Sequence, residues 1–171
     1  MNKSRSGFTI VELLIVIVVI GILAAITIVA YNGIQNKAND SAVKSDLASI
    51  GKKFEIYKVE NGVYPRGSGP ELYTLDLRVS RSSYGSHYDN GSGTFNFLSC
   101  WARADTPDKI ALIASSKSGN IFMYQNGTVS SFTGRWTGSP NSCADAGVAI
   151  DGTSGRDFFF STGVWLPYVK S

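Results

Sequence analysis

The sequence predicts an α+β protein in which a long N-terminal helix packs against a C-terminal antiparallel β-sheet. Three observations lead to this fold class. An apolar run opens the chain, no proline occurs before Pro65, and strand-like segments separated by turn residues fill the second half. Because helical and strand patterns occupy separate parts of the chain, the elements segregate rather than alternate, as in α+β folds.

The composition excludes several classes of protein. Of the 171 residues, 43% are hydrophobic and 12% aromatic, which excludes a disordered chain. Charged residues make up 17% and are unevenly spread, with none between Leu13 and Asn36. The chain is therefore neither a uniformly soluble globule nor a protein with several membrane spans. Its formal net charge of +3 predicts a mild electrostatic attraction to nucleic acid or a membrane surface.

The first expected element is a transmembrane helix over residues 8–30. Spanning a bilayer takes about 20 apolar residues, and this run contains a single charge, at Glu12. Lys3 and Arg5 precede the run and the next cation is Lys37, so the N-terminus should stay in the cytoplasm and the rest of the chain should be exported. The alternatives are a cleaved secretory signal, which has a shorter apolar core, and a plain signal anchor.

A signal anchor leaves the carboxylate of Glu12 unexplained. An acidic residue within a span costs about 2.5–3.5 kcal/mol on insertion scales and usually faces a partner. Cleavage after Gly7 would put a free α-amino group on Phe8, and the amine of a neighbouring copy could then neutralise Glu12. The other interpretation is a side chain at the headgroup boundary that reaches water. Both interpretations stay open on composition alone.

The residues around Glu12 carry a family resemblance. Gly-Phe-Thr-Ile-Val-Glu-Leu-Leu-Ile-Val over residues 7–16, continued by Gly-Ile-Leu-Ala-Ala-Ile over residues 21–26, resembles the leader junction and helix of type IV pilins and pseudopilins. The resemblance is close over residues 1–30 and loose up to Pro65. Val29 stands where many members have a proline, so no proline kink is expected in this helix.

The resemblance implies how the N-terminal region is processed and used. Residues 1–7 would be a leader peptide that a prepilin peptidase removes after Gly7 before it methylates the amine of Phe8. Glu12 would align each subunit against the amine of a neighbour during filament assembly. Gly21 and Ala25, four residues apart, offer a small-residue face on which helices can approach closely.

Beyond the apolar run the helix is expected to continue as a stem over residues 31–62. Apolar side chains recur there at spacings of three and four residues, which places them on one helix face for packing against a sheet. They are Val43, Leu47, Ile50, Phe54 and Tyr57. Gly62 is the expected C-cap, and Pro65 prevents the helix from continuing.

Residues 63–171 are expected to form a globular, β-rich surface domain. Residues 65–92 are rich in Gly, Ser and Arg and predict a loop with one turn of helix near residues 71–77. Asn126-Gly127 predicts a tight hairpin. The expected strands are 95–101, 109–115, 120–125 and 128–132, with one more pair from 157–160 and 163–169. Their order predicts an antiparallel meander that covers the stem helix.

Cys100 and Cys143 are the two cysteines of the chain. In an exported domain they can form a disulfide, worth about 4 kcal/mol in the chain-entropy model. Two buried free thiols are the alternative. The loop that such a disulfide closes also resembles the disulfide-stapled C-terminal regions of pilins.

No catalytic or metal site is predicted. His87, the single histidine, lies in a polar stretch without a nucleophile motif and is expected on the surface. Two cysteines and one histidine lack the paired spacing of a zinc site. Some pseudopilins carry a C-terminal calcium loop, but residues 151–157 lack the ordered acidic ligands of an EF-hand, so a plain turn is preferred there. We predict that the protein is not an enzyme and needs no cofactor.

Nucleic-acid binding is considered because pilins include DNA-uptake subunits. Arg66, Arg78 and Arg81 interleave with tyrosines after the stem, a combination that can contact phosphate and stack on bases. Acidic residues in the same stretch weaken its field, so a solvated loop is the preferred interpretation.

The resemblance therefore implies a structural subunit rather than a catalyst. We expect a type IV pilin precursor that polymerises through its N-terminal helix into a surface filament for adhesion, motility or DNA uptake. Its location would be the cytoplasmic membrane as a precursor, with the N-terminus inside, and then the cell-surface pilus, a helical homo-oligomer. Its partners would be the prepilin peptidase and the pilus assembly platform with its ATPase.

Two alternatives to the pilus subunit remain. One is a pseudopilin or minor pilin of a type II secretion or competence system, which would share the leader. The other is a single-span membrane-anchored binding protein that does not polymerise.

Overall fold

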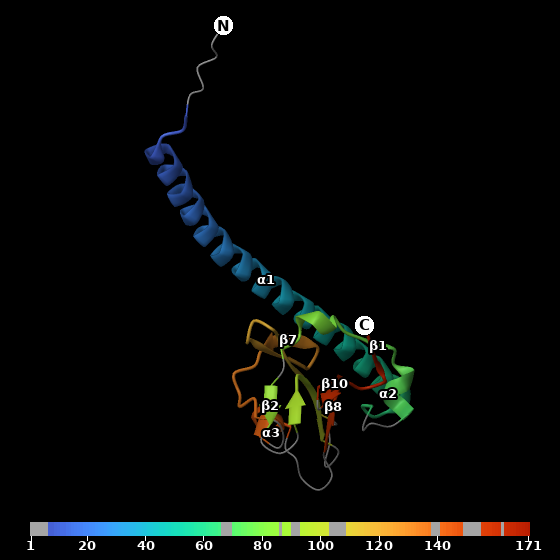
Figure 1. The fold of residues 1–171 in the computed structure, drawn as a ribbon. Coiled ribbons are helices and arrows are strands. Elements are labelled where there is room, and N and C mark those ends of the chain that lie inside the picture. The colour runs from blue at the N-terminus through green and yellow to red at the C-terminus, as the bar shows by residue number, and fades with distance from the viewer. Residues whose placement is uncertain are drawn as a thin grey trace. The chain divides into compact units, whose positions relative to one another are not determined.

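The structure is a computed structural model that describes residues 7–65, 70–85, 87–89, 93–102, 109–137, 141–148, 155–161 and 163–171. The chain divides into two compact units, residues 1–36 and 37–171. Helix α1 (Ile10–Asn61) enters both units, and every other described element belongs to the second (Figure 1). The predicted α+β class is confirmed, with one long helix followed by an antiparallel sheet.

Helix α1 contains 52 residues, a length of about 78 Å at 1.5 Å per residue. It is continuous through Val29 and through Gly33. At its C-terminal end Gly62 has a φ of +78°, and its N–H donates to the carbonyl of Lys58 at 2.8 Å. A glycine in the left-handed conformation caps free carbonyls in this way, which confirms the predicted helix end.

The first unit consists, in its described part, of the apolar half of α1. All of its described side chains are exposed, among them the large apolar ones from Phe8 to Ile34. By length and composition this helix could cross a membrane. Apolar side chains without a packing partner in their own chain require lipid or another protein to cover them.

The second unit is built on a five-stranded antiparallel sheet in the order β7-β6-β5-β4-β8. Its strands are β4 (Phe97–Ala102), β5 (Lys109–Ser115), β6 (Ile121–Gln125), β7 (Thr128–Ser131) and β8 (Gly155–Phe158). The turn between β6 and β7 is the predicted one, because Asn126 and Gly127 both have positive φ, 51° and 81°. That combination is the type I′ hairpin turn that Asn-Gly favours.

Two smaller sheets depart from the predicted meander. Strands β2 (His87–Asp89), β3 (Gly93–Phe95), β9 (Phe160–Ser161) and β10 (Val164–Trp165) pair in the order β10-β9-β3-β2. β1 (Leu77–Arg78) pairs in parallel with β11 (Val169–Lys170). The prediction of a loop was thus wrong at residues 77–78 and 87–89. Their partners in the sheets include the far end of the chain, which a local pattern does not report.

Both faces of the five-stranded sheet are covered. Four residues of the predicted stem stripe are almost fully buried on one face: Val43, Leu47, Ile50 and Phe54. They share a cluster with the sheet residues that point the same way, Phe97, Leu112, Ala114, Phe122 and Tyr124. The fifth predicted residue, Tyr57, is only partly buried. The stem of α1 is therefore one layer of the second unit.

The opposite face is covered by residues 132–137 and 141–148, which include the unpredicted short helix α3 (Asn141–Asp145). Leu98, Cys100, Ala111 and Ile113 point to this face because successive strand residues alternate sides. Cys100 of β4 and Cys143 of α3 are joined by a disulfide with a Cα–Cα distance of 5.5 Å. The disulfide thus ties this layer to the sheet. A further short helix, α2 (Pro70–Thr74), lies in the stretch where one turn was predicted.

Polar side chains of the stem hold loops of the same unit. The carboxylate of Asp46 accepts from the N–H of Ser80 at 2.6 Å and from the Tyr84 hydroxyl at 3.1 Å. The ammonium group of Lys53 donates to the carbonyl oxygens of Leu75, at 3.0 Å, and of Asp76. Burial raises the pKa of Asp46 above its ordinary value, and the hydrogen bonds from Ser80 and Tyr84 only partly oppose that effect.

Asp40 holds the turn between β5 and β6. Its carboxylate accepts from the Ser118 hydroxyl at 2.5 Å and from the Asn120 amide at 2.8 Å. Burial alone would raise the pKa of Asp40, but hydrogen bonds from the turn outweigh burial and the pKa is lowered. Folding therefore shifts the pKa values of the two carboxyl groups in opposite directions.

Candidate functional site

The N-terminal site lies in the first unit, around the start of α1. Gly7, Phe8 and Thr9 precede the helix and are exposed, with 85% of Phe8 accessible. The peptide bond between Gly7 and Phe8 is therefore neither helical nor covered by the described part of the chain. Exposed, non-helical backbone is where proteases cut, so the geometry is compatible with cleavage after Gly7.

Glu12 is engaged by Thr9. Its Oε2 accepts from the Thr9 N–H at 2.9 Å and from the Thr9 hydroxyl at 2.7 Å, while the Glu12 N–H donates to the Thr9 hydroxyl oxygen at 3.2 Å. These reciprocal bonds form a capping box, in which Thr9 is the N-cap and Glu12 the third helical residue. The Thr-x-x-Glu signal is readable in the sequence, but the prediction for Glu12 considered only an outside amine or water.

The capping box fixes where the Glu12 carboxylate lies. It is held at the N-terminal end of the helix, close to the partial positive charge of the helix dipole. Both hydrogen bonds from Thr9 fall on Oε2, so within the described residues Oε1 keeps its capacity to accept from an outside donor. An amine that approaches the start of α1 would meet a carboxylate already oriented toward the helix terminus.

The small residues of the helix face are open as well. An added Cβ at Gly21 would have no described atom within 4 Å, and Ala25 is exposed one turn later. In the described chain nothing covers this face, which leaves room for another helix to approach closely.

Two of the three arginines considered for nucleic-acid binding, Arg78 and Arg81, contact other groups of the second unit. Arg78 pairs with Asp76 at 3.2 Å, and Arg81 donates to the carbonyl oxygen of Val169 at 2.5 Å. Hydrogen bonds from Lys170 and Arg78 lower the pKa of Asp76 to about 2. Arg66 lies outside the described residues.

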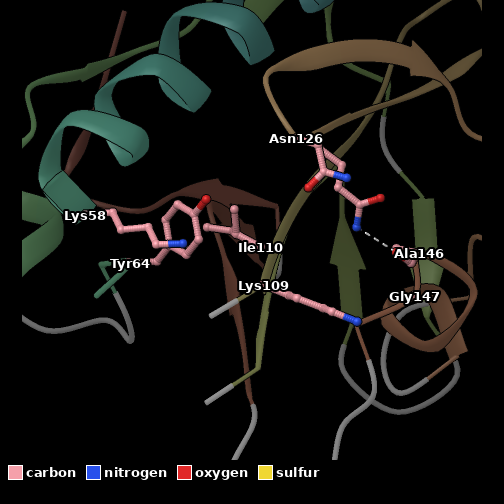
Figure 2. Close-up of a pocket in the computed structure, with 8 residues that line it drawn as sticks. Lys58, Tyr64, Lys109, Ile110, Asn126, Ala146 and Gly147 are labelled. Atoms are coloured by element: carbon pink, nitrogen blue, oxygen red, sulfur yellow. Dashed lines mark hydrogen bonds between the residues drawn. The ribbon is translucent and has the colours of Figure 1, made fainter. Parts of the chain in front are cut away.

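A cavity of about 430 Å³ opens beside the end of α1, lined by Lys58, Tyr64, Lys109, Ile110, Gln125, Asn126, Ala146 and Gly147 (Figure 2). Its side chains make contacts within the fold. The Lys58 ammonium lies 4.2 Å from the centroid of the Tyr64 ring, and the Gln125 amide donates to the carbonyl of Ala146 at 2.8 Å (Figure 2). The lining presents no nucleophile paired with a base, so the cavity offers no catalytic arrangement.

Metal ligands do not gather in the described residues, where no group of three or more His, Cys, Asp or Glu side chains could hold an ion. His87 lies in β2, and its side chain is outside the described part of the chain. Residues 151–154 of the stretch considered for calcium also lie outside it.

Comparison with known families finds a match over the N-terminal region. A family model described as the prokaryotic N-terminal methylation motif matches residues 2–28, which include Gly7, Phe8 and Glu12. The N-terminal region of the chain is that of a type IV pilin-like protein. Its leader motif and apolar helix indicate that it is anchored in a membrane.

Known relatives of this pilin-like protein include type II secretion system core protein G from several bacteria. The protein of Klebsiella pneumoniae is 37% identical over 91 residues, which cover 53% of this chain and 64% of that protein. Those of Aeromonas hydrophila and Klebsiella michiganensis are 38% and 36% identical over 66 and 64 residues, which cover 38% and 37% of this chain. These two matches span 46% and 45% of the relatives, about half of their length. No solved structure matches the chain.

These relatives bear on the function first expected. Their name refers to a secretion system, which favours the pseudopilin alternative over a subunit of a surface pilus. Adhesion and motility receive no support from them.

Proposed function

We propose that this pilin-like protein is the precursor of a pseudopilin, a structural subunit of a type II secretion-type assembly. The observation that carries the proposal is the identity to core protein G, 37% over 91 residues in one relative, together with the methylation motif over residues 2–28. The working form would be a homo-oligomeric filament in the cell envelope, and no catalytic step is assigned to the chain itself.

Processing would define the mature N-terminus. Hydrolysis of the Gly7–Phe8 peptide bond by a prepilin peptidase leaves a carboxylate on Gly7 and an amine on Phe8, and the same enzyme would methylate that amine. Lys3 and Arg5 leave with the leader, so the cations that set the membrane orientation are absent from the mature subunit. Exposure of Gly7 and Phe8 ahead of α1 supports this step.

Assembly would exchange lipid contacts of α1 for contacts with other copies of α1. The exposed apolar side chains from Phe8 to Ile34 would lie in the filament core, and Gly21 with Ala25 would let the helices approach closely. In that dry environment an ammonium and a carboxylate attract strongly. The Phe8 amine of one subunit would bind Glu12 of its neighbour and set the axial register.

The rest of the chain would have separate roles in this scheme. Residues 8–30 would be the membrane and polymerisation segment, 31–62 the stem, and 63–171 the envelope-exposed domain. The stem is one layer of the domain through its buried stripe, so we expect stem and domain to move as one body. An assembly platform and an ATPase would extract the subunit from the membrane.

Two measurements test the proposal. Amino-terminal sequencing and mass spectrometry of the mature chain should find a methylated Phe8, and a start at Met1 would refute processing. Deletion of the gene should then abolish export of secreted enzymes while surface filaments remain unchanged. If export is normal but filaments sheared from the cell surface are lost, the protein is instead a pilus subunit. A normal phenotype in both assays would favour the non-polymerising anchored protein.

A further inference from the structure

In the described part of the chain, strand β7 (Thr128–Ser131) is a short edge strand with no neighbour on its outer side. It ends the five-stranded sheet, three of its residues are exposed and Val129 is partly exposed. Natural edge strands are usually guarded by charged side chains, proline or a bulge. The sequence Thr-Val-Ser-Ser has no charge and no proline, and the register with β6 is regular over all four residues.

The hydrogen-bond phase shows which backbone groups of β7 face outward. The N–H of Phe132, the next residue, donates to the carbonyl of Ile121 on β6 at 2.9 Å. Bonded and non-bonded pairs alternate along an antiparallel ladder. Counting back by two residues, Ser130 and Thr128 are the positions that exchange hydrogen bonds with β6.

The N–H and C=O groups of Val129 and Ser131 therefore point away from the sheet. Within the described residues no backbone or side-chain group bonds to them. We propose that this edge binds an extended segment of another polypeptide as a sixth strand, through four backbone hydrogen bonds. Addition of a strand to an exposed edge is a general mode of peptide recognition.

A second copy joined antiparallel through the same edge is the competing occupant. Two identical antiparallel edges are related by a two-fold axis perpendicular to the sheet. Because the stem of α1 packs along one sheet face, that axis would reverse one stem relative to the other. The concentration dependence measured below distinguishes this occupant from a segment of another polypeptide.

The charge beside the edge indicates the chemistry of the occupant. The Lys44 ammonium lies 4.5 Å from the ring centroid of Phe122, and Phe122 is the register partner of Ser131. Asp40, one turn before Lys44, accepts from the Ser118 and Asn120 side chains and also interacts electrostatically with Lys44. A residue of the added strand beside Ser131 would place its stem-facing side chain near Lys44. The edge therefore fits an extended segment with an acidic residue at that position.

Hydrogen exchange tests the added strand directly. The full chain would be labelled with nitrogen-15 in detergent micelles and titrated with the synthetic peptide Thr-Val-Glu-Val-Thr. When nine tenths of the edges are filled, exchange at the Val129 and Ser131 amides should slow about tenfold, while Thr128 and Ser130, already bonded to β6, should not change. The peptide Thr-Val-Lys-Val-Thr is the matched control and should bind more weakly.

Two variants separate edge pairing from general binding. Ser131→Pro removes one outward N–H without breaking a bond to β6 and should abolish the slowing, whereas Ser131→Ala should keep it. No slowing up to the solubility limit of the peptide would overturn the proposal, as would equal slowing in Ser131→Pro. Slowing that rises with protein concentration in the absence of peptide would identify a second copy as the occupant and also overturn it. None of these readouts depends on leader cleavage or secretion.

Discussion

Adding one methyl group at Gly51 is expected to destabilise the second unit. Gly51 is a buried helix residue that faces β6 across the stem–sheet interface. A Cβ built on it would lie 2.3 Å from Cζ of Tyr124 and 2.4 Å from Cε1 and Cε2. Carbon atoms pack at about 3.5–4.0 Å, so the Tyr124 ring would have to move by about 1 Å or more.

The size of the effect follows from two opposing contributions. The ring of Tyr124 is 2% exposed and its strand is paired on both sides, so it has little room to move. Overpacking of such a site costs about 1–3 kcal/mol. Alanine is preferred to glycine in a helix interior by about 1 kcal/mol. With little room for relaxation, Gly51→Ala should lose about 1–2 kcal/mol, a decrease of about 3–8 °C in Tm.

Thermal unfolding of the full chain in detergent micelles measures this loss. The three tryptophans, Trp101, Trp136 and Trp165, all lie in the second unit and report its unfolding by fluorescence. Gly33→Ala is the matched control, because it adds the same methyl group to the same helix where no atom lies within 4 Å. A Gly51→Ala variant as stable as the parent would refute the close approach. Combining it with Tyr124→Val, which removes the ring, should give a smaller loss than the sum of the two single changes.

Four other predictions concern the disulfide, the N-terminal site and three carboxylates. Replacing Cys100 and Cys143 by serine should lower the free energy of unfolding, measured in urea, by about 4 kcal/mol, and equal stability would contradict this. The parent chain should be about 2 Da lighter before reduction than after it. Glu12→Ala should be cleaved normally but form no filaments by electron microscopy, and normal filaments would show that the register argument is wrong. Hydrogen bonds from the side chain and backbone of Arg135 lower the pKa of Asp145 to about 2, so its contribution is present above pH about 4 and is lost as pH falls toward 2. Asp145→Asn should remove that part of the acid unfolding curve, whereas an unchanged curve would exclude it. At pH 7 Asp40→Asn should destabilise more than Asp46→Asn, because the pKa of Asp40 is lowered and that of Asp46 is raised; denaturant midpoints that rank them the other way would contradict this.

Much of the fold was readable because its signals are local. The stripe from Val43 to Phe54 follows helical spacing, Gly62 supplies the left-handed cap, and Asn126-Gly127 specifies a type I′ turn. Strand β5 was predicted with the bounds that it has, Lys109–Ser115. Each of these features depends on residues within one or two turns of one another, so the pattern carries the structure.

The candidate site could be predicted because its motif is also local. The prediction was incomplete because it omitted the capping box. The motif from Gly7 to Glu12 is continuous in the sequence and needs no tertiary contact to be recognised. The capping box with Thr9 was also local, but the prediction weighed Glu12 as a charge in lipid and overlooked the backbone groups that the first helical turn leaves unpaired.

The amino-acid sequence by itself predicted a leader motif followed by an apolar helix, the continuation of that helix as a stem, and a β-rich domain after the stem. Only the tertiary structure decided that β1 pairs with β11, that residues 132–137 and 141–148 form a second layer over the sheet, and that Asp40 holds the turn at Ser118. It also left β7 as an open edge. The physical reason is range: periodicity and turn chemistry act between neighbours, whereas these contacts join residues far apart in the chain and form only when the core brings them together.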